Sequence, residues 1–588
     1  MASADRRKEN FELLLAMERT TLSGKLFIGT LTLFAAIGGF LFGYDTGIIS
    51  GSLLKLRVEF ALSVAWQEAV VSVTVGAAAL SSIVAGPSCD MFGRRPVLLA
   101  ASVVFTIGAV LMGAAQNAIM LLVGRIVVGL GVGFAAMAVP MYIAEVSPAS
   151  IRGKLILINS MFITGGMFSA TVLAGALSSL PLHIGWRIML GLAGVPSVIM
   201  FVGFIFLPES PRWLVFHGHE DKARRVLRQI RGHSEVEEEL KMITDDYQEH
   251  LKSHIGCIQQ VKKFFTSYPI MMALLVGCSL QMFQQLCGIN TILYYTASII
   301  EMAGYEDNDA IWLSVIPGFS NFFFTLVGLV LVDRLGRRKL WFISNAGLVL
   351  GLTMLIAAFL LKDSHGLKAT PLSIDSTCGY KSCWSCTADS SCGFCADYDP
   401  HTQQYLHGTC SNGLVNGSYF NNISICDLHT EYVNNSGNLS YTPTTLERKW
   451  FFSSCPDSLF GPLAIISLFV YLAFFAPGVG PLAWTINAEI YPTWARSTGI
   501  ALATSTNWVF NMIVSITFLS LVHALGQPLT FGLYTVLSCI SLFFVMLFLP
   551  ETKGKTLEDM EHLFQRPYFM RWCRQRILWK RLQEEQEE

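Results

Sequence analysis

The segment Asp90-Met-Phe-Gly-Arg-Arg-Pro96 returns later in the chain as Asp333-Arg-Leu-Gly-Arg-Arg-Lys339. The first copy follows the second apolar run of the sequence, and the other copy follows the eighth. These runs have the length of about twenty residues that a helix needs to cross a bilayer. A motif that returns six spans later predicts two related halves of six helices each.

Two further pairs of motifs occur in the same order in both halves. Ala144-Glu-Val-Ser-Pro148 matches Ala488-Glu-Ile-Tyr-Pro492, and Pro208-Glu-Ser-Pro-Arg-Trp-Leu214 matches Pro550-Glu-Thr-Lys-Gly554. Membrane transporters with such repeats bind their solute near the membrane midplane, between the repeats. The three matched motifs therefore predict a carrier of a small hydrophilic solute.

The composition argues against a soluble protein and against a nucleic-acid partner. Apolar residues make up 52% of the 588 residues, charged residues make up 14%, and the net charge is −1. The apolar residues gather in twelve runs. The first run continues past Leu54 without a cleavage site, which favours a retained span over a signal peptide.

Basic residues gather in alternate loops and give the expected orientation. They include Arg94 and Arg95, Arg152 and Lys154, and the segment 334–339. By the positive-inside rule these loops and both termini are cytoplasmic. We expect a multi-pass protein of the plasma membrane that acts as a monomer.

The long loop on the opposite side carries two signs of an outside location. It contains four acceptor sequons for N-glycosylation, at Asn416, Asn422, Asn434 and Asn438. It also holds eight of the fourteen cysteines, namely Cys378, Cys383, Cys386, Cys392, Cys395, Cys410, Cys426 and Cys455. Two Cys-x2-Cys pairs have a spacing that suits zinc, but an oxidising location favours disulfides. The sequence leaves their pairing open.

These observations predict an all-α membrane protein with twelve transmembrane helices in two six-helix repeats, cytoplasmic linker helices and a small disulfide-rich extracellular insert. The expected divisions are an N-terminus (1–23), the first half (24–208), a helical linker (209–268), three helices of the second half (269–361), the outer loop (362–456), the last three helices (457–549) and a tail (550–588).

The motifs resemble those of the sugar porter family of the major facilitator superfamily. The likeness extends from about Ser23 to Phe564 and includes Gln284-Gln-Leu-Cys-Gly-Ile-Asn290 in the seventh run and Gly480-Pro-Leu-Ala-Trp484 in the tenth. It implies the major facilitator fold and transport by alternating access.

Within that family the chain is similar to the proton-coupled inositol carriers. The likeness rests on Gly43-Tyr-Asp-Thr-Gly47 in the first run and on the cysteine-rich outer loop. It implies secondary active symport of a proton with myo-inositol or a related polyol. The spacing from Cys378 to Cys395 is also similar to that of plexin-semaphorin-integrin modules, which are small disulfide scaffolds.

Asp45 is an ionisable residue inside an apolar span, where such residues are functional candidates by default. We expect its partner to be Arg125 in the fourth run, as in the proton-coupled members of the family. Protonation of Asp45 would then break the pair. The alternative is a permanent ion pair that only fastens two helices together.

Amide and aromatic side chains in the second half are the expected solute ligands. A break at Gly288 would bring Gln285 and Asn290 to one side. Structural hydrogen bonds between helices are the competing role. The positions that match the family are Gln284, Gln285, Asn290, Asn321, Trp484, Asn507 and Asn511.

Two departures from the glucose carriers of the family favour a polyol. Asn159-Ser160 stands where those carriers have Gln, and Ala476-Pro477 stands where many of them have Glu.

Charged residues at the cytoplasmic helix ends form a predicted gate. Ion pairs among them would hold the inside closed and break as the halves rock. Their alternative role is to anchor the topology. The residues are Asp90, Arg94, Arg95, Glu145, Arg152, Asp333, Arg337, Arg338, Glu489 and Arg496.

Other functions remain open at this stage. A proton-independent hexose or polyol facilitator and a solute sensor are the alternatives. No nucleotide-binding loop, catalytic constellation or metal cluster is apparent, so we expect neither an enzyme nor a cofactor. The pattern Glu9-x-x-x-Leu13-Leu14 has the form of a signal that binds endocytic adaptors and would allow endosomal cycling. The alternative is that it forms part of a short amphipathic helix before the first span.

Overall fold

The computed structural model describes most of the helical part of the chain and portions of the long loop. The described residues are 21–148, 151–252, 266–365, 367, 369–370, 380, 383, 386, 392–399, 404–412, 414–415, 418–419, 432–433, 439–440, 447–451, 455, 460–491, 493–553 and 564.

Several predicted features lie outside these residues. They are the motif of Glu9, Leu13 and Leu14, the four sequons at Asn416, Asn422, Asn434 and Asn438, and Cys378 and Cys426. The side chains of Arg152 and Asp333 and most of the tail 550–588 are also outside the description.

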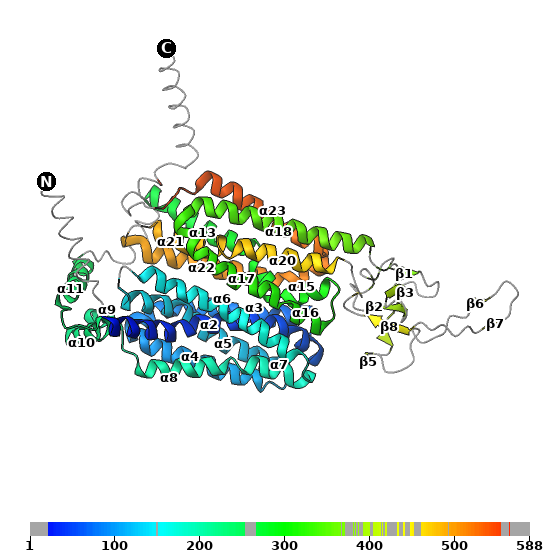
Figure 1. Ribbon diagram of the computed structural model, residues 1–588, viewed down its shortest axis with the longest axis horizontal. Coiled ribbons are helices and arrows are strands. Elements are labelled where there is room, and N and C mark those ends of the chain that lie inside the picture. Colours follow the sequence, from blue (N-terminus) through cyan, green and yellow to red (C-terminus); the bar gives the residue numbers. More distant parts are fainter. Residues whose placement is uncertain are drawn as a thin grey trace, which may run out of the picture.

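The described residues contain twelve helical segments long and apolar enough to cross a membrane, which is the predicted number. The first half consists of α2 (Leu22–Glu59), α3 (Val64–Phe92), α4 (Arg94–Gly113), α5 (Ala118–Val146), α6 (Arg152–Ser178) and the pair α7 (Leu182–Gly191) and α8 (Gly194–Phe206). In Figure 1 these helices lie side by side along the long axis of the molecule.

The second half repeats this plan with more interrupted helices. It consists of α13 (Tyr268–Leu286), α14 (Ile289–Tyr294), α15 (Thr296–Met302), α16 (Asp307–Leu313), α17 (Val315–Leu335), α18 (Arg337–His365), α20 (Gly461–Phe475), α21 (Val479–Glu489), α22 (Thr493–Leu525) and α23 (Gln527–Phe548). The seventh span breaks at Gly288, whose φ of 89° favours glycine. The tenth span breaks at Ala476, Pro477 and Gly478, between α20 and α21.

Helix contacts follow the repeat. In the first half α2 packs on α6 and α4 packs on α5 and α8. In the second half α13 packs on α22, and α18 packs on α20 and α23. The halves meet where α3 contacts α22 and where α6 contacts α17. α3 and α17 hold the same place in the two halves, and so do α6 and α22. The two contacts are therefore equivalent, as two repeats related by a pseudo-twofold axis require.

Glycines on one face of α2 allow its close approach to α6. Gly39, Gly43 and Gly47 recur at every fourth position, and a Cβ atom on any of them would meet backbone atoms of α6. At Gly43 that atom would overlap the Ile163 carbonyl oxygen. Membrane helices without large side chains at their contact gain van der Waals packing in this way.

The linker forms helices, as predicted, and they pack on the first half. Its elements are α9 (Pro211–Phe216), α10 (Glu220–Arg231) and α11 (Glu237–Lys252). Leu214, Leu227 and Leu240 belong to a small core of its own. We call the end of the bundle that carries α9–α11 the linker end (Figure 1).

Strands of the long loop lie at the opposite end, which we call the insert end (Figure 1). The largest sheet has the order β1-β3-β2-β8, with β1 (Ala369–Thr370) parallel to β3 (Gln404–Asn412). β2 (Cys392–Asp399) is antiparallel to β3 and to β8 (Glu447–Phe451). Two short hairpins, β4 (Leu414–Val415) with β5 (Ser418–Tyr419) and β6 (Tyr432–Val433) with β7 (Leu439–Ser440), complete the described strands.

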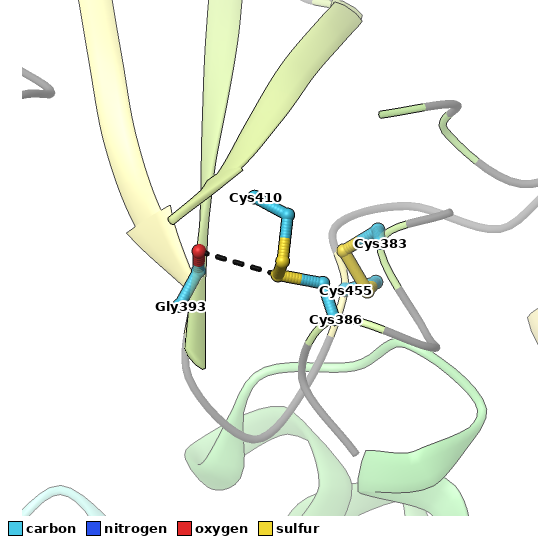
Figure 2. The surroundings of a disulfide bond; sticks show 5 residues. All are labelled: Cys383, Cys386, Gly393, Cys410 and Cys455. Atoms are coloured by element: carbon cyan, nitrogen blue, oxygen red, sulfur yellow. Dashed lines mark hydrogen bonds between the residues drawn. A yellow bond between two sulfur atoms is a disulfide. The ribbon is translucent and has the colours of Figure 1, made fainter. Parts of the chain in front are cut away.

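Disulfides hold the insert together. Cys383 is bonded to Cys455 and Cys386 to Cys410, and the four residues lie close together in Figure 2. Cys392 and Cys395 are also disulfide-bonded. The sulfur atoms of Cys383 and Cys386, one of the two pairs with zinc-like spacing, are therefore engaged in disulfides.

Gly43→Ala should destabilise the first half. The added methyl group has no room against the Ile163 carbonyl, and overpacking of this kind costs about 1–3 kcal/mol. The matched control is Gly29→Ala on the same helix, because a Cβ atom there meets nothing within 4 Å. We expect the temperature of half-aggregation in detergent to fall for Gly43→Ala alone. Equal temperatures for the two variants would contradict the packing described.

Candidate functional site

An ion pair inside the first half connects α2 with α5. Asp45 Oδ1 lies 2.6 Å from Arg125 Nη1, and the two residues are only 5% and 1% exposed. Arg125 Nε donates to the Val70 carbonyl of α3 at 3.0 Å, and Thr74 donates its hydroxyl to the Arg125 carbonyl at 3.2 Å. The pair therefore fixes three helices at one buried point.

Amide side chains of the second half form a continuous hydrogen-bonded group. Asn507 on α22 donates to Gln281 Oε1 and to Gln284 Oε1, each at 2.7 Å. Gln285 Nε2 lies 3.4 Å from Gln284 Oε1, and Asn290 donates to Gln285 Oε1 at 2.5 Å. We call these five residues the amide cluster.

The break at Gly288 contributes to this geometry. Gln285 lies in the last turn of α13 and Asn290 in the first turn of α14, so an unbroken helix would hold their side chains well apart around its axis. Gln284 also donates to the Gly480 carbonyl at 2.6 Å, at the start of α21. The cluster therefore touches both interrupted spans.

The remaining predicted ligands lie around the cluster. Asn511 is one turn beyond Asn507, and its Oδ1 is buried without a hydrogen-bond partner among the described residues. Asn321 Nδ2 lies 3.4 Å from Met167 Sδ of the other half. Trp484 on α21 is 44% exposed. The structure thus connects four predicted ligands, Gln284, Gln285, Asn290 and Asn507, in one chain of hydrogen bonds, and leaves the other three outside it.

Tyr294 connects the amide side of the bundle with the ion pair. Its side chain interacts with Asn511 and with Thr46, the neighbour of Asp45, and lies within electrostatic range of Asp45 and Arg125. Tyr294 belongs to the second half and Thr46 to the first. Tyr294 therefore links the ion pair to Asn511, one of the predicted solute ligands.

The matched motifs build the same network in each half at the linker end. Arg94 Nη2 lies 2.8 Å from Glu145 Oε1, and Arg337 Nη2 lies 2.8 Å from Glu489 Oε1. Asp90 lies 3.2 Å from Arg94. Each pair joins residues of one half only, so the predicted gate residues are connected within the halves in these contacts.

A carboxylate caps one helix in each of these networks. Glu209 accepts from the backbone N–H groups of Arg94 and Arg95 at the start of α4, at 3.0 and 3.1 Å. Glu551 accepts from the same groups of Arg337 and Arg338 at the start of α18, at 2.9 and 3.1 Å. Burial raises the pKa of the Glu209 carboxyl, while the backbone N–H donors act in the opposite direction.

Other predicted gate side chains make contacts of their own. Arg95 donates to the Phe204 carbonyl at 2.9 Å and Arg338 to the Met546 carbonyl at 2.9 Å. Arg496 is half-buried, and its Nε has no hydrogen-bond partner among the described residues.

The two halves are joined at the insert end by polar contacts. Arg57 of α2 lies 2.9 Å from Glu301 of α15 and 3.6 Å from Asp307 of α16. Lys55 donates to Asn308 at 2.6 Å. These contacts hold the halves together on this side.

Two more contacts between the halves lie deeper in the bundle. Ser50 accepts from the backbone N–H of Ala297 at 2.9 Å. Glu68 of α3 accepts from the backbone N–H and the hydroxyl of Ser520 on α22, both at 2.7 Å. The interface between the halves is therefore closed toward the insert end in this structure.

Sequence reasoning missed several of these residues. Gln281 precedes Gln284 by nearly one turn, and this spacing could have placed it in the amide cluster. Glu209 and Glu551 belong to one pair of matched motifs, 208–214 and 550–554. The repeat was recognised, but no capping role was predicted for these carboxylates. Glu68 was missed because the second run was taken to begin near Ala69, whereas α3 begins at Val64.

Comparison with known families decides the class of protein. The family model described as "Sugar (and other) transporter" matches residues 31–400 and 449–564. The chain belongs to this sugar transporter family. The match therefore confirms the predicted family, which is a family of transporters and not of enzymes.

Curated relatives in the sugar transporter family share most of the chain. The proton myo-inositol cotransporter of Homo sapiens is 46% identical over 92% of this chain and 82% of its own length. The Caenorhabditis elegans proton myo-inositol cotransporter hmit-1.1 is 38% identical over 92% and 90%. Inositol transporter 4 of Arabidopsis thaliana is 38% identical over 92% and 92%.

Solved structures confirm the predicted fold class. The proton:xylose symporter XylE bound to 6-bromo-6-deoxy-D-glucose aligns with a TM-score of 0.64 at 25% identity, over 92% of this chain and 100% of that one. The inward-open conformation of XylE from E. coli aligns with a TM-score of 0.64 at 25% identity, over 91% and 99%. This sugar transporter family member has the major facilitator fold.

Asn507→Leu and Asn511→Leu should separate structural amides from solute ligands. Asn507→Leu leaves the buried acceptors of Gln281 and Gln284 without their donor, which costs about 1–3 kcal/mol of stability. Asn511→Leu removes one contact with Tyr294 and an acceptor that has no partner among the described residues, so its effect on stability should be smaller than the loss of two hydrogen bonds at Asn507. We expect Asn511→Leu to raise the KM for the solute by about two- to tenfold. This factor corresponds to the free energy that one hydrogen bond contributes to binding.

Thermal stability in detergent and initial uptake rates measure the two effects. A larger loss of stability in Asn511→Leu than in Asn507→Leu, with no change in KM, would contradict these assignments.

Proposed function

We propose that this protein is a secondary active transporter that carries myo-inositol together with a proton by alternating access. The observation that carries the proposal is the ion pair of Asp45 and Arg125, buried inside a span at 2.6 Å. The names of the human and nematode relatives, which are proton myo-inositol cotransporters, support the same function.

The proton would bind to Asp45. A buried carboxylate with one cationic partner exchanges its ion pair for a neutral carboxyl when it takes up a proton. Arg125 then keeps its bond to the Val70 carbonyl, while its contact with Asp45 weakens. Because the pair joins α2 to α5, protonation would release α2 from one of its fixed points.

Solute binding would be coupled to this step through Tyr294. Tyr294 interacts with both Thr46 and Asn511, so movement of α2 changes the environment of a proposed ligand. A ligand and a proton that favour the same conformation raise each other's affinity by the same factor. This reciprocity lets a proton gradient drive accumulation of the solute.

The proposed solute site is the amide cluster with its neighbours. A polyol ring carries a hydroxyl group on each carbon, and each hydroxyl both donates and accepts. Amides match this pattern because they also do both. The ligands would be Gln284, Gln285, Asn290, Asn321, Asn507 and Asn511, with Trp484 stacking on the ring. The Oδ1 atoms of Asn159 and Asn511 have no hydrogen-bond partner among the described residues, so each could accept a hydrogen bond from a solute hydroxyl.

The proposal includes an orientation and a location. The linker end carries Arg94, Arg95, Arg337 and Arg338, and a cytoplasmic position of this end satisfies the positive-inside rule. The insert would then face outward, where its disulfides persist. We place the protein in the plasma membrane, as a monomer with both termini in the cytoplasm.

The gate assignment also belongs to the proposal. Arg94–Glu145 and Arg337–Glu489 would keep each half rigid at the linker end and supply surfaces that meet when the inside closes. Asp90, Arg95, Arg338, Arg496 and the side chains of Arg152 and Asp333 would complete these surfaces.

Asp45→Asn should abolish proton coupling. We expect inward current on addition of myo-inositol to the parent chain, with a larger current at an outside pH of about 5.5 than at about 7.5. The amide cannot be protonated, so the variant should show neither the current nor its pH dependence. Whole-cell current measured together with labelled uptake tests this. Asp309→Asn is the matched control, because Asp309 is exposed.

Other outcomes favour the alternative functions. Uptake by the parent chain without current or pH dependence would show a facilitator in which Asp45 is structural. Binding of myo-inositol without flux of any hexose or polyol would favour a sensor. Either result would overturn the proposed symport.

A further inference from the structure

The break of the tenth span leaves two backbone groups without their helical partners. In an unbroken helix each carbonyl accepts from the N–H group four residues further along. Pro477 has no N–H, and Gly478 donates to the Phe475 carbonyl, three residues before it, at 3.2 Å. The carbonyl of Phe474 and the N–H of Val479 must therefore find partners outside their own helix.

One hydroxyl group of a neighbouring helix meets both of them. Ser344 of α18 donates to the Phe474 carbonyl at 2.6 Å and accepts from the Val479 N–H at 2.9 Å. Ser344 is 1% exposed. Backbone groups buried in this way are costly when they have no partner, because water does not reach them. The hydroxyl therefore bridges the end of α20 and the start of α21.

Close packing at the break fixes the place of this hydroxyl. A Cβ atom on Gly478 would overlap the Ser344 side chain. A Cβ atom on Gly328 of α17 would lie 2.6 Å from the Cα atom of Pro477. Both α17 and α18 thus pack directly against the break, and Ser344 lies where its hydroxyl faces the interrupted backbone.

The first half provides an internal comparison. By the register of the repeated motifs, Ala101 of α4 holds the position of Ser344, and residues 132–134 of α5 hold the position of the break. α5 is one continuous helix through these residues. A continuous helix pairs its own backbone groups there and offers none to a neighbouring hydroxyl. The hydroxyl therefore occurs in the half whose span is broken.

The segment beyond the break contacts the proposed solute site. Gln284 of the amide cluster donates to the carbonyl of Gly480, the second residue of α21, at 2.6 Å. Trp484, the proposed stacking residue, lies about one turn further along α21. A change of the angle between α20 and α21 would move the Gly480 carbonyl away from Gln284 and displace Trp484.

We propose that Ser344 is a positioning residue for solute binding, whose hydroxyl holds the break of the tenth span at the angle that keeps α21 against the amide cluster. Its hydroxyl is engaged by two backbone groups and does not bind the solute. Without it, α21 can pivot at Pro477 and Gly478, and Gln284 loses its fixed contact. The inference rests on the proposed solute site and adds a residue that acts on it through the backbone.

Ser344→Ala removes both hydrogen bonds and tests the role by transport. We expect the KM for myo-inositol to rise by about two- to tenfold, because solute binding must then also fix α21. The maximal rate per folded molecule should change less. Ser320→Ala is the matched control, since Ser320 of α17 is buried and donates to the Phe469 carbonyl of the same α20 at 2.9 Å, away from the break. Its KM should equal that of the parent chain.

The angle at the break is measured with two spin labels in the full chain. Keto amino acids at the exposed positions of Ile466 on α20 and Ala488 on α21 carry the labels, so the native cysteines stay in place. The two positions are about 33 Å apart along the helices. Double electron–electron resonance gives the distribution of the distance between them, which does not depend on the identity of the solute.

We expect a wider distribution in Ser344→Ala than in the parent chain, and no widening in Ser320→Ala. Ser344→Cys places a weaker donor and acceptor at the same position, so its KM and its distribution should lie between those of Ser344→Ala and the parent chain. This variant also tests the proposal if Ser344→Ala does not fold.

Two outcomes would overturn the proposal. An unchanged distance distribution would show that the break does not depend on the hydroxyl. A wider distribution with the KM of the parent chain would show that the hydroxyl holds the break without positioning the solute site. If the parent chain carries no myo-inositol, the proposed function fails, and the distance distribution still decides whether Ser344 fixes the break.

Discussion

The ion pair of Asp45 and Arg125 is the constraint around which the first half is arranged. Two opposite charges in a medium of low polarity hold each other strongly, and removal of one partner leaves the other buried at a cost of about 3–5 kcal/mol. The pair ties α2 to α5, and Arg125 also holds α3 through the Val70 carbonyl. Because glycines seat α2 directly on the α6 backbone, α2 cannot shift without moving its neighbours. In the proposed cycle one proton therefore acts on a group of packed helices.

The two ends of the bundle use polar contacts in different ways. At the linker end the repeated motifs build equivalent networks, each of which connects residues of one half and caps one helix with a carboxylate. Such networks suit halves that move as rigid bodies. At the insert end Arg57, Glu68 and Ser50 reach across to the other half. In the proposed cycle those contacts break when the insert end opens, so their energies help to set the balance between the two states.

The sequence predicts this fold well where a feature repeats or depends on length. Twelve apolar runs and three matched motifs predict the two halves, and the internal position of Asp45 marks it as a functional residue. The break of the seventh span at Gly288 could be predicted because Gln285 and Asn290 would otherwise lie on different sides of one helix. Features that depend on helix ends or on contacts between distant segments were not predictable. Glu68 belongs to a span only because α3 begins five residues before the run of apolar residues does. The strands of the insert and the pairing of its cysteines depend on contacts between distant parts of the loop.

Reciprocal coupling in liposomes tests the central claim most directly. The purified chain is reconstituted with a pH-sensitive dye inside, and a gradient of myo-inositol is imposed without a pH gradient. If the proton and the solute share one cycle, inward flow of myo-inositol should acidify the interior, with the membrane potential clamped, and mannitol should not. Flow of labelled myo-inositol without any change in internal pH would contradict the account, because the ion pair would then have no part in moving protons.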